Sequence, residues 1–170
     1  MKDNIKDAIN DQIQAEFNSA YVYLAMSAYA EDQGWPGTAS WLRAQAQEEE
    51  QHAMKFYNFM IERDEKVELQ ALPKPETEFG NLQDIFDKSL EHEQMITEKI
   101  NKLYKMAKEE DDYAFESFLK WFLDEQVEEE DMIRDILDKF ELADGDKSTL
   151  YMIDQELGQR QDGGQQGQSE

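Results

Sequence analysis

The sequence has 170 residues, of which 39% are hydrophobic and 34% are charged. Its net charge is -23 and its pI is about 4.3, so a nucleic-acid partner, which needs a basic surface, is not expected. The lack of cysteine excludes disulfides, zinc–thiolate sites, iron–sulfur clusters and cysteine nucleophiles. The excess of carboxylates suits cation binding, high solubility or a saline environment, and composition does not choose among these three.

The sequence contains no recognisable export or membrane segment. The first 17 residues carry charges throughout and lack the continuous apolar core of a signal peptide. No run of about 18 apolar residues occurs, so neither a transmembrane span nor a membrane partner is expected. The expected compartment is the cytoplasm.

Long segments with helical periodicity occupy the first half of the chain. The first runs from about residue 4 to 32 and ends at the Gly- and Pro-containing stretch 32–38. We take Thr38 as the N-cap of a second helix that reaches about residue 64. Residues 65–81, which contain two of the three prolines, then form an unusually long connection.

The second half of the chain repeats this pattern. Asn81 or a neighbour can cap a third helix to about residue 109, and an acidic break precedes a fourth helix to about 141. A short fifth helix is expected over 148–157. The sequence therefore predicts an all-α, ferritin-like four-helix bundle with one long crossover between the second and third helices. Residues 1–157 would form one domain, and the Gly/Gln-rich tail 158–170 would be disordered.

Helical wheels place a glutamate inside the apolar stripe of each long helix, near its midpoint. These residues are Glu16, Glu49, Glu93 and Glu129. His52 lies one turn from Glu49 on the same face. One inward glutamate is usually a packing irregularity, but four carboxylates converging in a dry core must be neutralised. Because no lysine or arginine shares these faces, the pattern predicts a metal site.

The donor set narrows the choice of metal. Carboxylates and one imidazole without thiolate favour iron or manganese over structural zinc. One glutamate per helix together with Glu-x-x-His is the arrangement of di-iron carboxylate bundles. The glutamates beside the central ones differ in direction: Glu48 and Glu128 lie at stripe edges, and Glu50 points to solvent. Glu125 and Gln126 lie one turn before Glu129, where Gln126 fits as a neutral hydrogen-bonding group.

At these residues the sequence resembles the bacterial non-haem ferritins. The resemblance covers residues 5 to about 157 and includes "QAEFNSAYVYLAM", "RAQAQEEEQHAMKF", "LQALPKPETEFG", "HEQMITEKIN" and "FLKWFLDEQVEEED". It implies iron storage and detoxification by a ferroxidase that oxidises Fe(II) with dioxygen or peroxide. It also implies a homo-oligomeric shell of about 24 subunits, typical of bundles of this family, that holds a ferric mineral.

The resemblance assigns roles to individual residues. Glu16, Glu49 and His52 would hold the first iron, and Glu49 would bridge to a second iron held by Glu93 and Glu129. A third iron site would be formed by four side chains: Glu48, Glu125, Glu128 and Glu129. Tyr23 and Trp121 match aromatic residues beside the di-iron centre of the family, and Gln126 would lie in the inner shell.

Haem is not expected. Haem-binding bacterioferritins repeat Glu-x-x-His in the fourth helix, whereas this sequence has "EQVEEED" there. They also carry a haem-ligating methionine directly after the second-helix glutamate, where this sequence has Glu50. The other histidine, His92, falls at the edge of its stripe, and a surface or packing role is expected for it.

Two other classes of function compete with iron storage. One is a di-iron oxidoreductase that acts on a separate substrate. The other is a non-enzymatic helical assembly protein with an incidental cation site. Iron loading of the size-fractionated protein separates the three hypotheses.

Overall fold

Five α-helices make up the computed structural model, which describes residues 1–160, and no strand occurs over this range. The helices are α1 (Asp3–Asp32), α2 (Pro36–Glu62), α3 (Leu82–Glu109), α4 (Tyr113–Ala143) and α5 (Lys147–Leu157). The expected all-α fold is therefore confirmed. Within residues 1–160, no helix is both long enough and apolar enough to cross a membrane. Most of the tail predicted to be disordered, residues 161–170, lies outside the described residues.

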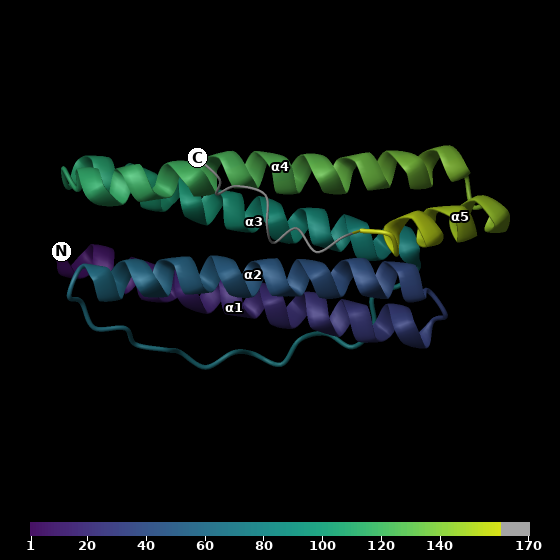
Figure 1. Ribbon diagram of the computed structural model, residues 1–170, viewed down its shortest axis with the longest axis horizontal. Coiled ribbons are helices and arrows are strands. Elements are labelled where there is room, and N and C mark those ends of the chain that lie inside the picture. The colour runs from purple at the N-terminus through teal and green to yellow at the C-terminus, as the bar shows by residue number, and fades with distance from the viewer. Residues whose placement is uncertain (161–170) are drawn as a thin grey trace, which may run out of the picture.

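The connection between α2 and α3 runs along the whole of α1 (Figure 1). The backbone N–H of Glu68 donates to Oδ1 of Asn10 at 2.9 Å, near the start of α1. The hydroxyl of Tyr29, near the end of α1, donates to the carbonyl of Gly80 at 2.9 Å. The connection thus carries the chain back to the end of the bundle where α2 begins. Helices α2 and α3 are parallel as a result, which is the crossover predicted from the sequence.

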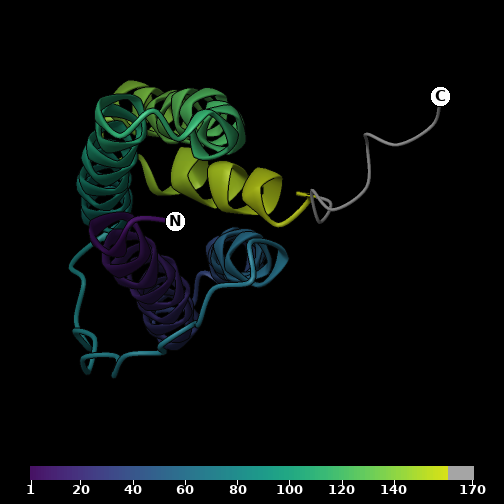
Figure 2. The same cartoon turned by 90° about the vertical axis from the view of Figure 1, so that its left-hand side faces the viewer.

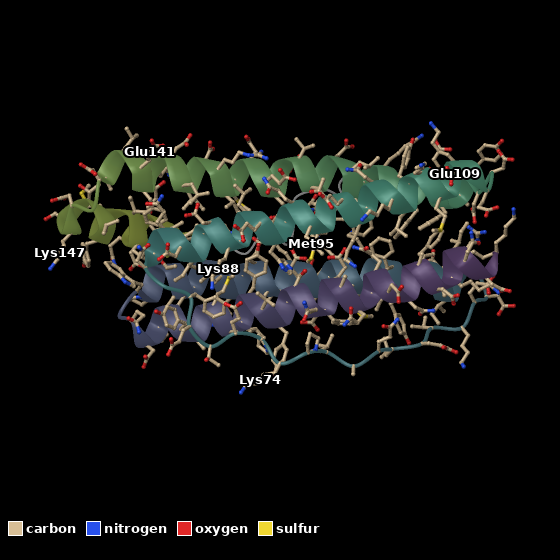
Figure 3. All side chains as sticks on the ribbon, turned by 180° about the vertical axis from the view of Figure 1, so that it is seen from behind. Lys74, Lys88, Met95, Glu109, Glu141 and Lys147 are labelled. Atoms are coloured by element: carbon tan, nitrogen blue, oxygen red, sulfur yellow. The ribbon has the colours of Figure 1, made fainter. Side chains whose placement is uncertain are left out.

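Salt bridges and caps fix the ends of the helices. Asn81 caps the start of α3, as expected, and it forms a reciprocal capping box with Asp84. Lys88, labelled in Figure 3, ties α3 to Glu76 of the crossover at 2.7 Å. At the other end of the bundle, the Asp112 side chain caps α4 and pairs with Arg63 at 3.0 Å.

The predicted N-cap of α2 is wrong. The helix starts two residues before Thr38, with Pro36 in its first turn and Trp35 at the N-cap. Proline suits this position because the first helical residues have no N–H partner within the helix. Thr38 instead donates from its backbone N–H and from its hydroxyl to Oδ1 of Asp154, at 2.7 and 2.8 Å. It therefore attaches α5 to α2.

The apolar core is divided into two clusters by a polar layer. One cluster lies towards the α5 end and includes Trp41, Phe86 and Phe140. The other lies towards the opposite end, where Phe56 and Phe122 stack with their ring centroids 4.3 Å apart. Buried polar residues fill the level between them: Glu16, Gln45, Glu49, His52, Glu93, Gln126 and Glu129. A helical wheel of residues 4–32 places Leu24 on the same inner face as Glu16, but Leu24 is 46% exposed, so this prediction is wrong.

Helix α5 lies against α2 and α4 (Figure 2). Its C-terminal end points back along the bundle towards the polar layer (Figure 1). This direction determines where residues 158–160, the last ones that the structure describes, can reach.

Candidate metal centre

Each long helix places one glutamate in the polar layer, close to its own midpoint. Glu16, Glu49, Glu93 and Glu129 are between 0% and 3% exposed, and His52 is 3% exposed. Their burial agrees with the helical pattern of the sequence. So many carboxylates away from water are unfavourable unless protons or cations neutralise them.

Three buried atoms of this layer have no hydrogen-bond partner among the described residues. They are Oε2 of Glu16, Oε2 of Glu49 and Nδ1 of His52. One ligand atom from each of these residues lies within 4.8 Å of the other two, and His52 Nδ1 is 3.6 Å from Glu49 Oε2. An unpaired buried polar atom costs about 1–3 kcal/mol. Two carboxylate oxygens and one imidazole nitrogen converging in this way fit a metal cation.

A second group shares the same histidine. Three ligand atoms, one each from His52, Glu125 and Glu129, also lie within 4.8 Å of one another. His52 Nε2 is 3.9 Å from Oε1 of Glu125, which is half-buried. The family resemblance implied that Glu125 and Glu129 share an outer site, but it did not imply that His52 would face that site as well.

The carboxylate of Glu93 is held by neutral donors. The Tyr23 hydroxyl donates to Oε1 at 2.5 Å, and the Gln126 amide donates to Oε2 at 3.2 Å. Glu93 belongs to neither of the two candidate metal groups found among residues 1–160. The three residues expected to hold the second iron are Glu49, Glu93 and Glu129. They lie in the same polar layer as the first group, but their ligand atoms do not all come within 4.8 Å of one another. Their assignment stays a prediction.

Two glutamines that sequence reasoning missed orient the central carboxylates. Gln12 donates to Oε1 of Glu16 at 2.7 Å. Gln45 donates to Oε2 of Glu129 at 2.6 Å and to Oε1 of Glu49 at 3.4 Å. Each glutamine lies four residues before a central glutamate of its own helix, on the same face. This four-residue spacing could have identified both glutamines from the sequence.

Burial sets the electrostatics of the centre. It raises the pKa of Glu16 and of Glu49 well above the usual range, and neighbouring carboxylates raise them further. Burial and the charge of Glu93 raise the pKa of Glu129 to about 8. The pKa of Glu93 is also raised by burial, against the opposing effect of its Tyr23 and Gln126 hydrogen bonds. A bound cation would reverse these shifts by favouring the ionised carboxylates.

The remaining predicted residues lie around the edge of the layer. Glu48 is half-buried, and Glu128 and Glu50 are exposed. The ring of Trp121 meets the ring of His52 edge-on, with centroids 5.4 Å apart. Trp121 is therefore beside the centre, as the family resemblance implied.

His92 packs rather than facing the centre. Its Nε2 is 2.6 Å from the Ser19 hydroxyl, and its ring meets Tyr23 edge-on at 6.1 Å. Burial lowers the pKa of His92 to about 4. These contacts agree with the packing role expected for it.

Comparison with known proteins gives one consistent result. The family model described as "Ferritin-like domain" matches residues 6–143. A bacterial non-heme ferritin of Staphylococcus saprophyticus is 40% identical over 154 residues, which is 91% of this chain and 92% of that protein. A probable bacterial non-heme ferritin-like protein of Haemophilus influenzae is 38% identical, over 93% of this chain and 96% of that one.

Solved structures agree with these relatives. An open pore ferritin from the archaeon Archaeoglobus fulgidus superposes with a TM-score of 0.93 at 41% identity, covering 95% of this chain and 99% of that one. A humanized archaeal ferritin gives the same TM-score and identity, with 98% of its chain covered. The carboxylate and histidine groups in the bundle supply a candidate site for the iron that this family stores and oxidises. The chain belongs to the ferritin family of iron-storing ferroxidases.

Proposed function

We propose that this protein oxidises Fe(II) inside its four-helix bundle and stores the product as a ferric mineral within a shell of 24 subunits. The observation that carries the proposal is the set of three unpaired buried atoms, Glu16 Oε2, Glu49 Oε2 and His52 Nδ1. Dioxygen or peroxide is the oxidant. One electron leaves each of two Fe(II) ions, so an iron pair delivers the two electrons that convert dioxygen to peroxide or peroxide to water.

The substrate irons take two neighbouring positions in the polar layer. Glu16, Glu49 and His52 hold the first iron. Glu49 bridges to the second, which Glu93 and Glu129 complete. Carboxylates can bridge metals about 3.5–4 Å apart. Because carboxylates are hard oxygen donors, they stabilise Fe(III) more than Fe(II) and so favour oxidation.

Neutral side chains position these ligands. The Tyr23 hydroxyl and the Gln126 amide orient the carboxylate of Glu93. Because they carry no charge, they leave the carboxylates to be neutralised by iron.

A third iron position, between the centre and solvent, uses Glu48, Glu125, Glu128 and Glu129. The half-buried Glu48 and Glu125 support a role in passing iron to or from the centre.

Membership of the ferritin family supports the proposed assembly and its setting. Twenty-four copies enclose the mineral, and the net charge of -23 per chain concentrates Fe(II) near the shell. The cytoplasm is the compartment in which we place it. Residues 1–157 form the ferritin-like domain.

Iron loading with size separation tests this function. The purified protein is loaded aerobically with Fe(II), and iron and protein are measured across a size-exclusion profile. We expect a large assembly that holds many irons per chain. Elution as a monomer or dimer with about two irons per chain would instead favour a di-iron enzyme that acts on another substrate.

The site itself is tested by matched variants. Glu49→Ala and His52→Ala should abolish the initial fast oxidation of Fe(II). Glu50→Ala, one residue from Glu49 but exposed, should leave it unchanged. Unchanged rates in the first two variants would refute the site assignment.

A further inference from the structure

Arg160, three residues beyond the end of α5, is held at the outer edge of the metal centre by three contacts. Its Nη2 donates to Oε2 of Glu48 at 2.5 Å, and its Nη1 donates to Oε1 of Gln45 at 2.9 Å. Its guanidinium carbon lies 4.7 Å from the centroid of the Trp41 ring. The two charged side chains are only 15% and 20% exposed. A planar guanidinium can hydrogen-bond to a carboxylate and an amide while it stacks on an aromatic ring. This geometry favours arginine over lysine.

The docking of α5 brings Arg160 to this place. Asp154, which is 1% exposed, accepts hydrogen bonds from the backbone N–H groups of Gly37 and Thr38 and from the Thr38 hydroxyl. Gly37 permits this approach, since a Cβ there would lie 1.8 Å from the Asp154 carbonyl oxygen. The anchored helix points back along the bundle (Figure 1). Its end therefore reaches Glu48, which lies further along α2 than the anchor.

Arg160 is also connected to the inner carboxylates through Gln45. The Gln45 amide accepts from Arg160 through its oxygen and donates through its nitrogen to Glu129. An amide has one acceptor end and one donor end, so the arginine fixes which end faces the centre. The guanidinium thus neutralises the outer carboxylate Glu48 and orients the amide that holds Glu129.

We propose that Arg160 is a positioning residue that competes with divalent cations for Glu48, so that the outer position binds iron only transiently. This inference rests on the outer site of the proposed function. A cation that binds Glu48 must break the ion pair and face a nearby positive charge. The outer position is thereby kept weaker than the inner pair, and iron moves through it in either direction instead of resting there.

Lys55 provides a matched control. Like the guanidinium of Arg160, its ammonium group lies over a tryptophan ring: Nζ is 4.1 Å from the ring centroid of Trp121. Within residues 1–160 it has no carboxylate oxygen within 4.0 Å, so its charge acts on the outer carboxylate Glu125 from a distance but makes no ion pair with Glu48. Removing Lys55 changes the net charge of the region as much as removing Arg160 does. The pair of variants therefore separates a specific competition from a general electrostatic effect.

The experiment is a Zn²⁺ titration of the full-length, assembled, iron-free protein by isothermal calorimetry. Zn²⁺ is used because it does not undergo oxidation. We expect Arg160→Gln to tighten the weakest class of bound Zn²⁺ by about 3- to 10-fold, the effect of removing a partly buried ion pair. Lys55→Gln should change it by less than about 2-fold, and Arg160→Lys should be intermediate. Crystals soaked in limiting Zn²⁺ should show anomalous density beside Glu48 earlier in Arg160→Gln than in the wild type.

Three results would overturn the inference: unchanged or weaker outer binding in Arg160→Gln, an equal gain in Lys55→Gln, or no ion beside Glu48 in either wild type or Arg160→Gln. None of these results would contradict the assignment of the inner ferroxidase site, which is tested separately by Fe(II) oxidation in Glu49→Ala. Conversely, normal oxidation in Glu49→Ala would refute the proposed function even if Arg160→Gln tightens Zn²⁺ at Glu48.

Discussion

The hydroxyl of Tyr23 donates a 2.5 Å hydrogen bond to Oε1 of Glu93, joining α1 to α3 through the polar layer. Burial and the charge of Glu93 raise the pKa of Tyr23 well above its usual range, so the hydroxyl stays protonated and remains a donor. Tyr23→Phe should lower the initial rate of Fe(II) oxidation by about 10-fold, the effect of losing a group that orients a ligand. The ring should stay packed against His92. A normal rate with an unchanged circular dichroism spectrum would contradict this prediction.

Glu49→Gln should separate stability from activity. The substitution keeps the shape of the side chain but removes a carboxylate that is 1% exposed. We expect Fe(II) oxidation to fall by at least about 100-fold, because a direct ligand is lost. The metal-free protein should become more stable by about 1–3 kcal/mol, because one buried acid is removed. Thermal and denaturant unfolding measure the gain, and Glu50→Gln, at an exposed position, should change neither property.

The stability of the metal-free protein should depend on pH through Glu129. Its pKa is raised from 4.5 to about 8 in the folded protein. Between these values the folded state holds a proton that the unfolded state has released, so the free energy of unfolding falls as pH rises from about 4.5 to 8. The measurement is the difference in unfolding free energy between wild type and Glu129→Gln. If that difference stays constant over this pH window, the prediction fails.

Metal binding should release protons for the same reason. A cation favours the ionised form of Glu16, Glu49 and Glu129, whose raised pKa values keep protons bound in its absence. Zn²⁺ affinity should therefore increase from pH 6 to pH 8. Calorimetry in buffers of different ionisation enthalpy gives the number of protons released, which should be lower in Glu129→Gln.

Asp154→Ala should loosen α5. The change removes the carboxylate that accepts three buried hydrogen bonds. The backbone N–H groups of Gly37 and Thr38 then lose their acceptor. We expect a loss of about 1–3 kcal/mol in stability and faster hydrogen exchange of the α5 backbone amides. Glu156→Gln is the control, because the ion pair of Glu156 with Lys139 is exposed and such pairs contribute little. Equal protection of α5 in both variants would show that Asp154 is not its anchor.

Helical periodicity was enough to predict the fold and the inward direction of the central glutamates. It worked because each long helix has a single buried stripe, and a carboxylate inside such a stripe is conspicuous. Asn81 was predictable as a cap because its partner Asp84 lies within the same turn. Thr38 was not, because its actual partner is Asp154, which is 116 residues away.

The finer features of the site depend on which helices meet, and periodicity does not contain that information. Leu24 falls on the inner stripe of a wheel but is 46% exposed, because the faces of α1 that are covered depend on its neighbours. Glu93 faces inward as predicted, yet its carboxylate is held by Tyr23 and Gln126 from two other helices. Arg160 could not be predicted because its position follows from the direction in which α5 docks.

The polar layer between the two apolar clusters also fixes the alignment of the helices. A slip of one helix by a single turn would move its central glutamate about 5.4 Å along the bundle axis. The carboxylate would then lie closer to the apolar residues of one cluster and would no longer be opposite the other three. Apolar packing alone tolerates such shifts more readily than a buried charge does. The layer that binds metal therefore also gives the bundle a single register, so the centre is assembled correctly whenever the protein folds.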